Sequence, residues 1–381
     1  MQSFRHPHGS QPPRRRVLRS LDSRPSPRRG GLLLRSMVII LVLGMLSLVS
    51  SCMTLPKTGR ATVLDSPNSP DSPGQTPPPP EQAQDSTQDG IAAMNAGRQD
   101  PLVWILEKPG VRLTILGSVH LAHPGMFPLP DYILEAFDSA DRLVVEVDLS
   151  RLTPGYTQKI TMEAITLPKG TSLLELIPEQ TSDRLIEVLT DYPLPPGFAE
   201  SLQPWALEQL LITMTAAREG IHTEQGIDAY FIQRAISQDK SIHELETLEE
   251  QLGYFQLIPR ESHIASLDHT LESLEEIPGD IHALLQAWKA GDLHAIEALI
   301  WEDWDPDRAD DVINQILLTD RNHRWVDRIE AMIHPGGTEP SPQNAARGEN
   351  LFVVVGFGHL VGEESLVELL VDRGFTVRST F

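Results

Sequence analysis

One apolar run near the end of the chain, Leu351–Val355, sets the strongest limit on the fold. Its residues are mostly β-branched and unbroken by polar positions, which is typical of a strand covered on both faces within a parallel sheet. The run stops at Gly356-Phe357-Gly358, and His359 follows. In open α/β sheets, ligands bind just beyond the carboxyl ends of the strands. We therefore expect His359 to face a functional site.

A second run repeats this design much earlier in the chain. Leu113–Leu116 leads to His120, so both runs end in Gly-x-x-His. The preceding segment, Leu102–Leu106, turns at Pro109-Gly110 and is the expected hairpin partner. Residues 157–332, between the two runs, have mainly helical periodicity. The sequence thus predicts an α/β fold with a mixed, largely parallel sheet built from both ends of the domain, interrupted by a long helical insertion.

The first 52 residues have the composition of a delivery segment. Residues 1–51 contain nine arginines and one acidic residue, Asp22, whereas the whole chain has a formal net charge of -22. The apolar run from Met37 to Val49 is too short for an ordinary membrane span but suits a signal sequence. Val49-Ser50-Ser51-Cys52 is similar to a bacterial lipobox, in which the cysteine carries the lipid. The alternative is a short uncleaved anchor with an incidental cysteine.

The composition after residue 52 indicates a tether followed by one domain, and the charge and cysteine content of the chain argue against some kinds of partner and site. Residues 53–98 are rich in Pro, Ser, Asp and Gln, so we expect a disordered tether, followed by a domain over residues 99–381. The acidic balance argues against nucleic acid as a partner. Cys52 is the one cysteine, which excludes a disulfide within the chain and a zinc site built on several thiolates.

Three residues in or just after expected strands are candidates for a metal centre: His120, Glu146 and His359. Two neutral imidazoles and a carboxylate bind a divalent metal and leave a position free for water. The metal lowers the pKa of that water and supplies hydroxide near neutral pH. Glu146 lies in the apolar run Arg142–Asp148, where an unpaired carboxylate is costly. The alternatives are core or loop histidines and a buried salt bridge from Glu146 to an arginine, such as that of Arg142.

Four further polar residues are secondary candidates. Glu246 follows a short apolar segment and could act as a base or as an outer-shell group. Arg321 and Asn322 could steady the negative charge that develops on a carbonyl oxygen. A solvated charge or a helix cap is the alternative for these three, and Asp228 fits the start of a helix equally well. His123 fits best as an exposed residue of the loop after the first Gly-x-x-His.

A series of short motifs runs through the domain in a consistent order: Gly117-Ser118-Val119-His120, Leu129-Pro130, Val144-Val145-Glu146-Val147-Asp148, Gln203-Pro204-Trp205-Ala206, Gly226-Ile227-Asp228, Leu245-Glu246-Thr247, Glu250-Gln251, Trp288 with Gly291-Asp292, Arg321-Asn322 with Trp325, and Gly356-Phe357-Gly358-His359. Over about residues 100 to 381, this succession resembles the TraB/GumN family, related to the Tiki metalloproteases and more distantly to the erythromycin-esterase and ChaN-like folds. The resemblance implies that His120 and His359 are the paired Gly-x-x-His residues and Glu146 their acidic partner. Ser118 stands where threonine is usual, and His123 matches no family motif.

The resemblance also implies an activity. We expect a metal-dependent hydrolase, acting on peptides or another small molecule, on the extracytoplasmic face of a bacterial cell envelope. Its partners would be a divalent metal (Zn, Mn or Co), the substrate, and the membrane through a lipid on Cys52. One alternative is a non-catalytic module on the same fold that binds a metal, haem or a peptide. The other is a structural envelope lipoprotein in which the histidines no longer act.

Overall fold

The computed structural model describes residues 103–120, 126–195, 197–221, 226–301, 312–333 and 348–378. The expected signal sequence, Cys52 and the tether lie outside the described residues, and so does His123. Within the described ranges, no helix is both long enough and apolar enough to cross a membrane.

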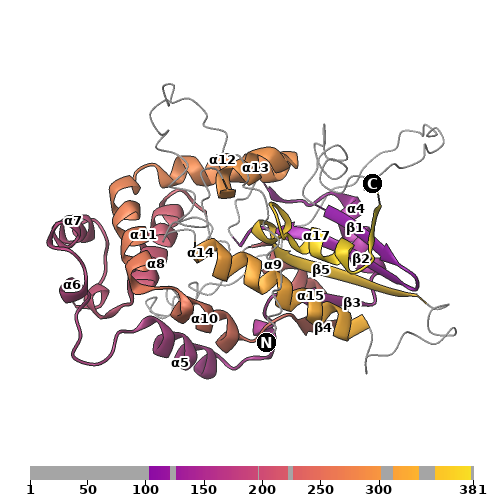
Figure 1. The fold of residues 1–381 in the computed structure, drawn as a ribbon, viewed down its shortest axis with the longest axis horizontal. Coiled ribbons are helices and arrows are strands. Elements are labelled where there is room, and N and C mark those ends of the chain that lie inside the picture. The colour runs from indigo at the N-terminus through magenta and orange to yellow at the C-terminus, as the bar shows by residue number, and fades with distance from the viewer. Residues whose placement is uncertain are drawn as a thin grey trace, which may run out of the picture.

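The core of the fold is a six-stranded sheet with the order β4-β3-β5-β2-β1-β6 (Figure 1). β2, β5, β3 and β4 run parallel, and β1 runs antiparallel to both β2 and β6. Because β5 lies between β2 and β3, the central strands come from opposite ends of the domain, which confirms the predicted α/β class. The strands are β1 (Val103–Lys108), β2 (Val111–Ser118), β3 (Arg142–Val145), β4 (Ser241–Glu244), β5 (Glu349–Gly356) and β6 (Thr376–Arg378).

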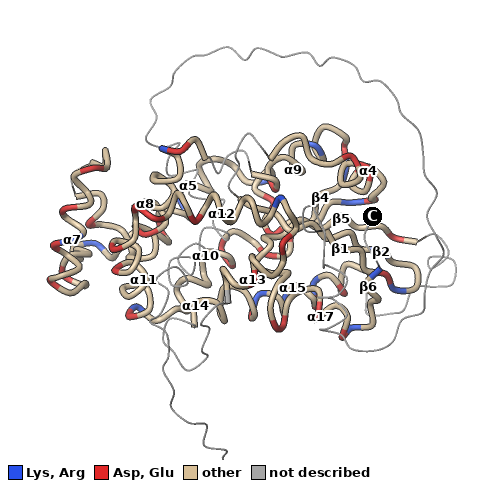
Figure 2. The backbone as a smooth tube through the Cα atoms, turned by 90° about the horizontal axis from the view of Figure 1, so that it is seen from above, with Lys and Arg blue, Asp and Glu red and all other residues tan. Residues whose placement is uncertain are grey.

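Helices cover both faces of this sheet, which is why its central strands are largely apolar and buried. Figure 2 shows α4 (Asp131–Ser139) and α9 (Ile227–Ser237) on one side and α15 (Asp320–Ile333) and α17 (Leu366–Asp372) on the other. On the α4/α9 side, the rings of Phe137, Phe231 and Phe352 pack with centroids 4.9 to 5.4 Å apart. All residues of β5 from Leu351 to Gly356 are buried, as expected for a strand with two covered faces.

The helical insertion builds a second apolar core beside the sheet (Figure 1). Its centre includes Trp205 stacked on Phe255, with ring centroids 4.3 Å apart. The remaining helices are α5 (Pro154–Ile165), α6 (Leu173–Leu176), α7 (Glu179–Leu189), α8 (Pro204–Arg218), α10 (Leu248–Leu257), α11 (Arg260–Ser273), α12 (Ile277–Ala290), α13 (Leu293–Trp301) and α14 (Val312–Asn314), with the π-helix Gln315–Thr319 and the 3-10 turns Leu149–Arg151, Ala199–Ser201 and Phe357–Leu360. Of these, α12 and α13 bury their apolar residues in the core of the sheet.

The four parallel strands end at one edge of the sheet, and a polar residue follows each of them within three positions. One detail of the sequence analysis changes here: β3 ends at Val145, so Glu146 follows the strand instead of lying within it. In sheet order, Glu246 follows Glu244 of β4, Glu146 follows Val145 of β3, His359 follows Gly356 of β5, and His120 follows Ser118 of β2.

Candidate functional site

Glu146 is the carboxylate next to the middle of the sheet, and it is 4 % exposed. Its Oε1 accepts a hydrogen bond from the backbone N–H of Gly356, at 2.7 Å. Its Oε2 accepts from Arg321 Nη2 at 2.7 Å and from Gln251 Nε2 at 3.3 Å. The buried salt bridge weighed as an alternative for Glu146 is therefore present, with Arg321 as the partner. Arg142 instead pairs with Glu349.

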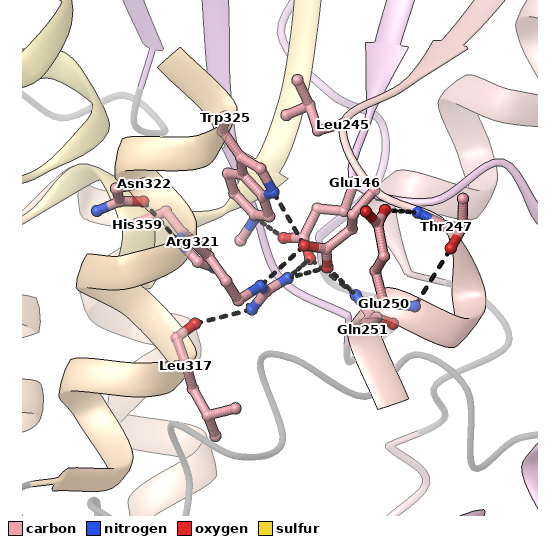
Figure 3. A network of polar contacts seen from close by, with 12 residues as sticks. Glu146, Leu245, Thr247, Glu250, Gln251, Leu317, Arg321, Asn322, Trp325 and His359 are labelled. Atoms are coloured by element: carbon pink, nitrogen blue, oxygen red, sulfur yellow. Dashed lines mark hydrogen bonds and ion pairs between the residues drawn. The ribbon is translucent and has the colours of Figure 1, made fainter. Parts of the chain in front are cut away.

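Arg321 lies at the centre of the polar network drawn in Figure 3, and its side chain is fully buried. Its guanidinium pairs with Glu146 and also with Glu246, whose Oε1 and Oε2 lie 2.7 Å from Nη2 and 3.2 Å from Nε. Nη1 donates to the carbonyl oxygen of Leu317 at 2.8 Å. One arginine thus joins two buried glutamates that follow neighbouring strands, and its positive charge offsets part of the cost of burying two acidic groups.

Glu246 is held on the far side of the same guanidinium. Trp325 Nε1 donates to its Oε2 at 3.0 Å, and Gln251 Nε2 donates to its Oε1 at 3.0 Å. Both donors come from helices, Gln251 from α10 and Trp325 from α15 (Figure 3). Glu246 thus accepts from Gln251, Arg321 and Trp325, and in this arrangement it holds these neighbours in place.

His359 is 1 % exposed, and both of its ring nitrogens have partners. Nδ1 lies 2.7 Å from Asn322 Oδ1, and Nε2 lies 3.1 Å from Arg321 Nη1. The Asn322 amide is oriented by its Nδ2, which donates to the carbonyl of Glu364 at 3.0 Å. Oδ1 can only accept, so the proton of His359 lies on Nδ1, and Nε2 accepts from Arg321. Burial and the nearby guanidinium hold the pKa of His359 well below 6.5, which keeps the ring neutral.

His120 stands at the outer end of the network. Its Nδ1 lies 2.9 Å from Asp228 Oδ2, and the side chains of this pair are 9 % and 17 % exposed. Asp228 Oδ1 accepts from Ser118 Oγ at 2.8 Å, and Asp228 is in the first turn of α9, where the helix dipole favours an anion. The Nε2 atom of His120 is buried without a hydrogen-bond partner and lies 3.9 Å from Glu146 Oε1.

Charge controls the protonation of this pair. Burial lowers the pKa of His120, but the carboxylates of Asp228 and, to a lesser extent, Glu146 outweigh burial and raise it from 6.5 to about 9. Burial also raises the pKa of Asp228, yet the interaction with His120 leaves it below 3.8. Burial raises the pKa of Glu146 in spite of the Arg321 charge. At neutral pH the outer pair is therefore an imidazolium beside a carboxylate.

Gly226 holds the backbone of His120 in place. A Cβ atom added to Gly226 would lie 2.8 Å from the carbonyl oxygen of His120, closer than such atoms approach each other. Gly226→Ala is therefore expected to push the two segments apart and lower the free energy of unfolding by about 1–3 kcal/mol. Urea unfolding measures this free energy.

Gly253→Ala is the control, because a Cβ there meets nothing within 4 Å. This substitution should leave the stability unchanged or raise it by up to about 1 kcal/mol. Equal effects at the two positions would contradict this account.

The three residues expected to hold a metal converge, but only His120 presents a nitrogen without a hydrogen-bond partner, and that nitrogen carries a proton while the ring is an imidazolium. His120 Nε2 is free, whereas His359 Nε2 faces an arginine N–H and both oxygens of Glu146 accept from protein donors. Among the described residues, no group of three or more His, Cys, Asp or Glu has an arrangement that could hold a metal ion. In this arrangement the donor set does not fit a three-ligand centre, because the Arg321 guanidinium lies between Glu146 and His359. The metal centre stays a prediction.

The sequence singled out most of this network and missed part of it. His120, Glu146, His359, Glu246, Arg321 and Asn322 all belong to it. The role of Asp228 as partner of His120 was missed, since the first turn of a helix explains an aspartate by itself. Gln251 was not considered for the site, although a polar residue between Leu248 and Phe255 on the buried face of α10 is a signal. Trp325 was named within a motif, and its ring is buried in the core while its Nε1 donates to Glu246.

The fold and site together define a class: an α/β protein with a buried cluster of charged residues at the carboxyl edge of its sheet. The family model for the TraB/PrgY/gumN family matches residues 102–379, and the chain belongs to this family. It is 26 % identical over 263 residues to the uncharacterized protein YbaP of Escherichia coli, covering 69 % of this chain and 89 % of YbaP. It is 21 % identical over 282 residues to an uncharacterized protein of Treponema pallidum, covering 72 % and 81 %. No solved structure matches.

Proposed function

We propose that this protein is a hydrolase of ester or amide bonds, held at a bacterial membrane by a lipid on Cys52. The observation that carries the proposal is the buried, unpartnered Nε2 of His120, at the sheet edge where ligands bind in open α/β folds. Its Nδ1 is held by a carboxylate, the arrangement that orients a histidine for proton transfer. Peptides are the first substrate class to test, because the family resemblance points to peptidases.

The reaction uses water as the nucleophile. As the water attacks the carbonyl carbon, Glu146 Oε1 takes one of its protons, and burial makes this carboxylate a stronger base. His120 Nε2 gives its proton to the leaving oxygen or nitrogen as the bond to the carbonyl carbon breaks. Asp228 stays charged and stabilises the imidazolium. Dependence on a divalent metal is the further expectation from the family resemblance, and no step here is routed through one.

A ligand-binding module is the second candidate. It is favoured by the mutual pairing of Glu246, Arg321, Asn322 and His359, which leaves few donors for a reacting substrate. Such a module would bind a peptide or small molecule without turning it over.

The test is hydrolysis by the purified full-length protein in detergent. Fluorogenic peptides and nitrophenyl esters are supplied with EDTA or with Mn²⁺, Co²⁺ or Zn²⁺. We expect turnover, reduced by about 10²–10⁴-fold in His120→Gln. His294→Gln is the matched control, because His294 is exposed on α13 and remote in sequence from every site residue. Turnover unchanged in His120→Gln, or absent under all conditions, would reject the hydrolase.

A separate experiment tests the lipid anchor: Cys52→Ser should move the protein from the membrane fraction to the soluble fraction.

A further inference from the structure

The guanidinium of Arg321 has a complete set of partners. It carries five N–H donors, and five acceptor contacts are present: Nε to Glu246, Nη2 to Glu246 and to Glu146, and Nη1 to Leu317 and to His359. Its Cζ atom lies over the Trp325 ring, 4.6 Å from the centroid. A fully buried arginine with every donor satisfied is a fixed part of the site, because any other placement would leave a charge unpaired away from water.

The atoms that Arg321 contacts are the ones that a metal would need. Glu146 Oε2 and His359 Nε2 both point their lone pairs at the guanidinium, at 2.7 Å and 3.1 Å. A divalent cation that bridged these two side chains would take the place of the guanidinium. The displaced arginine charge would then lie beside the metal charge in a buried site, where repulsion is poorly screened.

The helix before Arg321 is shaped to bring it there. Gln315–Thr319 form a π-helix that runs directly into α15. Single π-turns interrupt regular helices mostly at functional positions, since the wider turn changes which groups the following residues reach. Here the carbonyl oxygen of Leu317, inside that turn, accepts from Arg321 Nη1. The helix therefore contributes both the arginine and one of its acceptors.

We infer that Arg321 is the resident cation of this centre, and that the folded protein binds no divalent metal between Glu146 and His359. The positive charge that compensates the buried side chains of Glu146 and Glu246 comes from Arg321 and not from a bound metal. This inference concerns the same site as the proposed hydrolase but not its activity. A metal-free hydrolase and a metal-free binding protein are both compatible with it.

The test measures metal content and thermal unfolding, and neither needs a substrate. Purified full-length wild-type protein should contain no stoichiometric Mn, Co or Zn, and EDTA or added Mn²⁺ should leave its Tm unchanged to within about 1 °C. Arg321→Ser leaves the carboxylates and His359 Nε2 without a cation. Its Tm should be lower, and Mn²⁺ or Zn²⁺ should raise it by roughly 5 °C or more, because the ion replaces the missing charge. Arg321→Lys keeps a charge and should show no such rescue.

The wild-type measurement decides the matter even where Arg321→Ser does not fold. One equivalent of metal in the wild type, removed by EDTA with a fall in Tm, would overturn the inference. So would an Arg321→Ser protein that folds and gains nothing from Mn²⁺ or Zn²⁺. Hydrolysis that is lost in EDTA and restored by Mn²⁺ would also overturn it and would leave the proposed hydrolase standing.

Discussion

Glu246→Ala is expected to lower the free energy of unfolding by about 3–5 kcal/mol, because it removes one partner of a buried ion pair and leaves charge uncompensated. Arg321 would lose the acceptors of two donors, and Trp325 Nε1 would lose its acceptor altogether. The side chains of Glu246 and Arg321 are both fully buried, so water cannot replace the lost contacts. For a domain of this size the change corresponds to a fall in Tm of roughly 10 °C.

The matched control for this prediction is Glu249→Ala. Glu249 is the same residue type, three positions further on, but it is exposed in the first turn of α10. Its removal should change stability by no more than about 0.5 kcal/mol. Thermal and urea unfolding of the two variants and the wild type compare them directly. If Glu246→Ala were as mild as Glu249→Ala, the buried network would not stabilise the fold.

Asp228→Asn is expected to lower the pKa of His120 from about 9 toward its ordinary value of 6.5. Burial by itself lowers the pKa of this imidazole, and the Asp228 carboxylate makes the larger of the two contributions that raise it, the other coming from Glu146. The amide of asparagine retains the shape of the side chain and removes the charge. An NMR titration of the histidine ring protons measures the shift. The resonances of His243, whose pKa is lowered by burial and by Arg142, serve as the internal control.

The same shift makes stability depend on pH. His120 has a higher pKa in the folded protein than in the unfolded chain, so its contribution is present in full below about pH 6.5. It is lost as the pH rises through about 9, and the loss amounts to about 3 kcal/mol at most. Urea unfolding between pH 6.5 and 9.5 should therefore show a fall in stability for the wild type that is absent in Asp228→Asn. Parallel curves for the two proteins would show that the carboxylate does not control His120.

The class of the fold could be predicted because the signals were local. An unbroken apolar run predicts a strand covered on both faces, and Leu351–Val355 is such a strand. The Gly-x-x-His ending places each histidine just past the end of its strand, wherever that strand lies in the sheet. The structure adds that the two strands, β2 and β5, are neighbours. Glu146 and Glu246 could be named as candidates for the same reason, because each lies close to the end of an expected strand.

The partners within the site could not be predicted, because they depend on contacts between distant segments. Glu146 and Arg321 are 175 residues apart, and His359 faces Arg321 only because α15 lies beside the turn Phe357–Leu360 that follows β5. The sequence offered Arg321 as a group for the substrate, whereas the structure places it among protein acceptors. A signal was available: Arg321 and Trp325 are four residues apart, on the same buried stripe of α15. An arginine on such a stripe needs buried acids opposite it.

The place of β5 in the sheet has a consequence for synthesis and export. The strand consists of residues 349–356, yet it fills the gap between β2 and β3, which are made much earlier. A chain that emerges with its N-terminus first carries His120 and Glu146 for most of its synthesis with no strand between them. The site therefore forms only once the last part of the domain has arrived. Fragments that end before β5 therefore lack the assembled site.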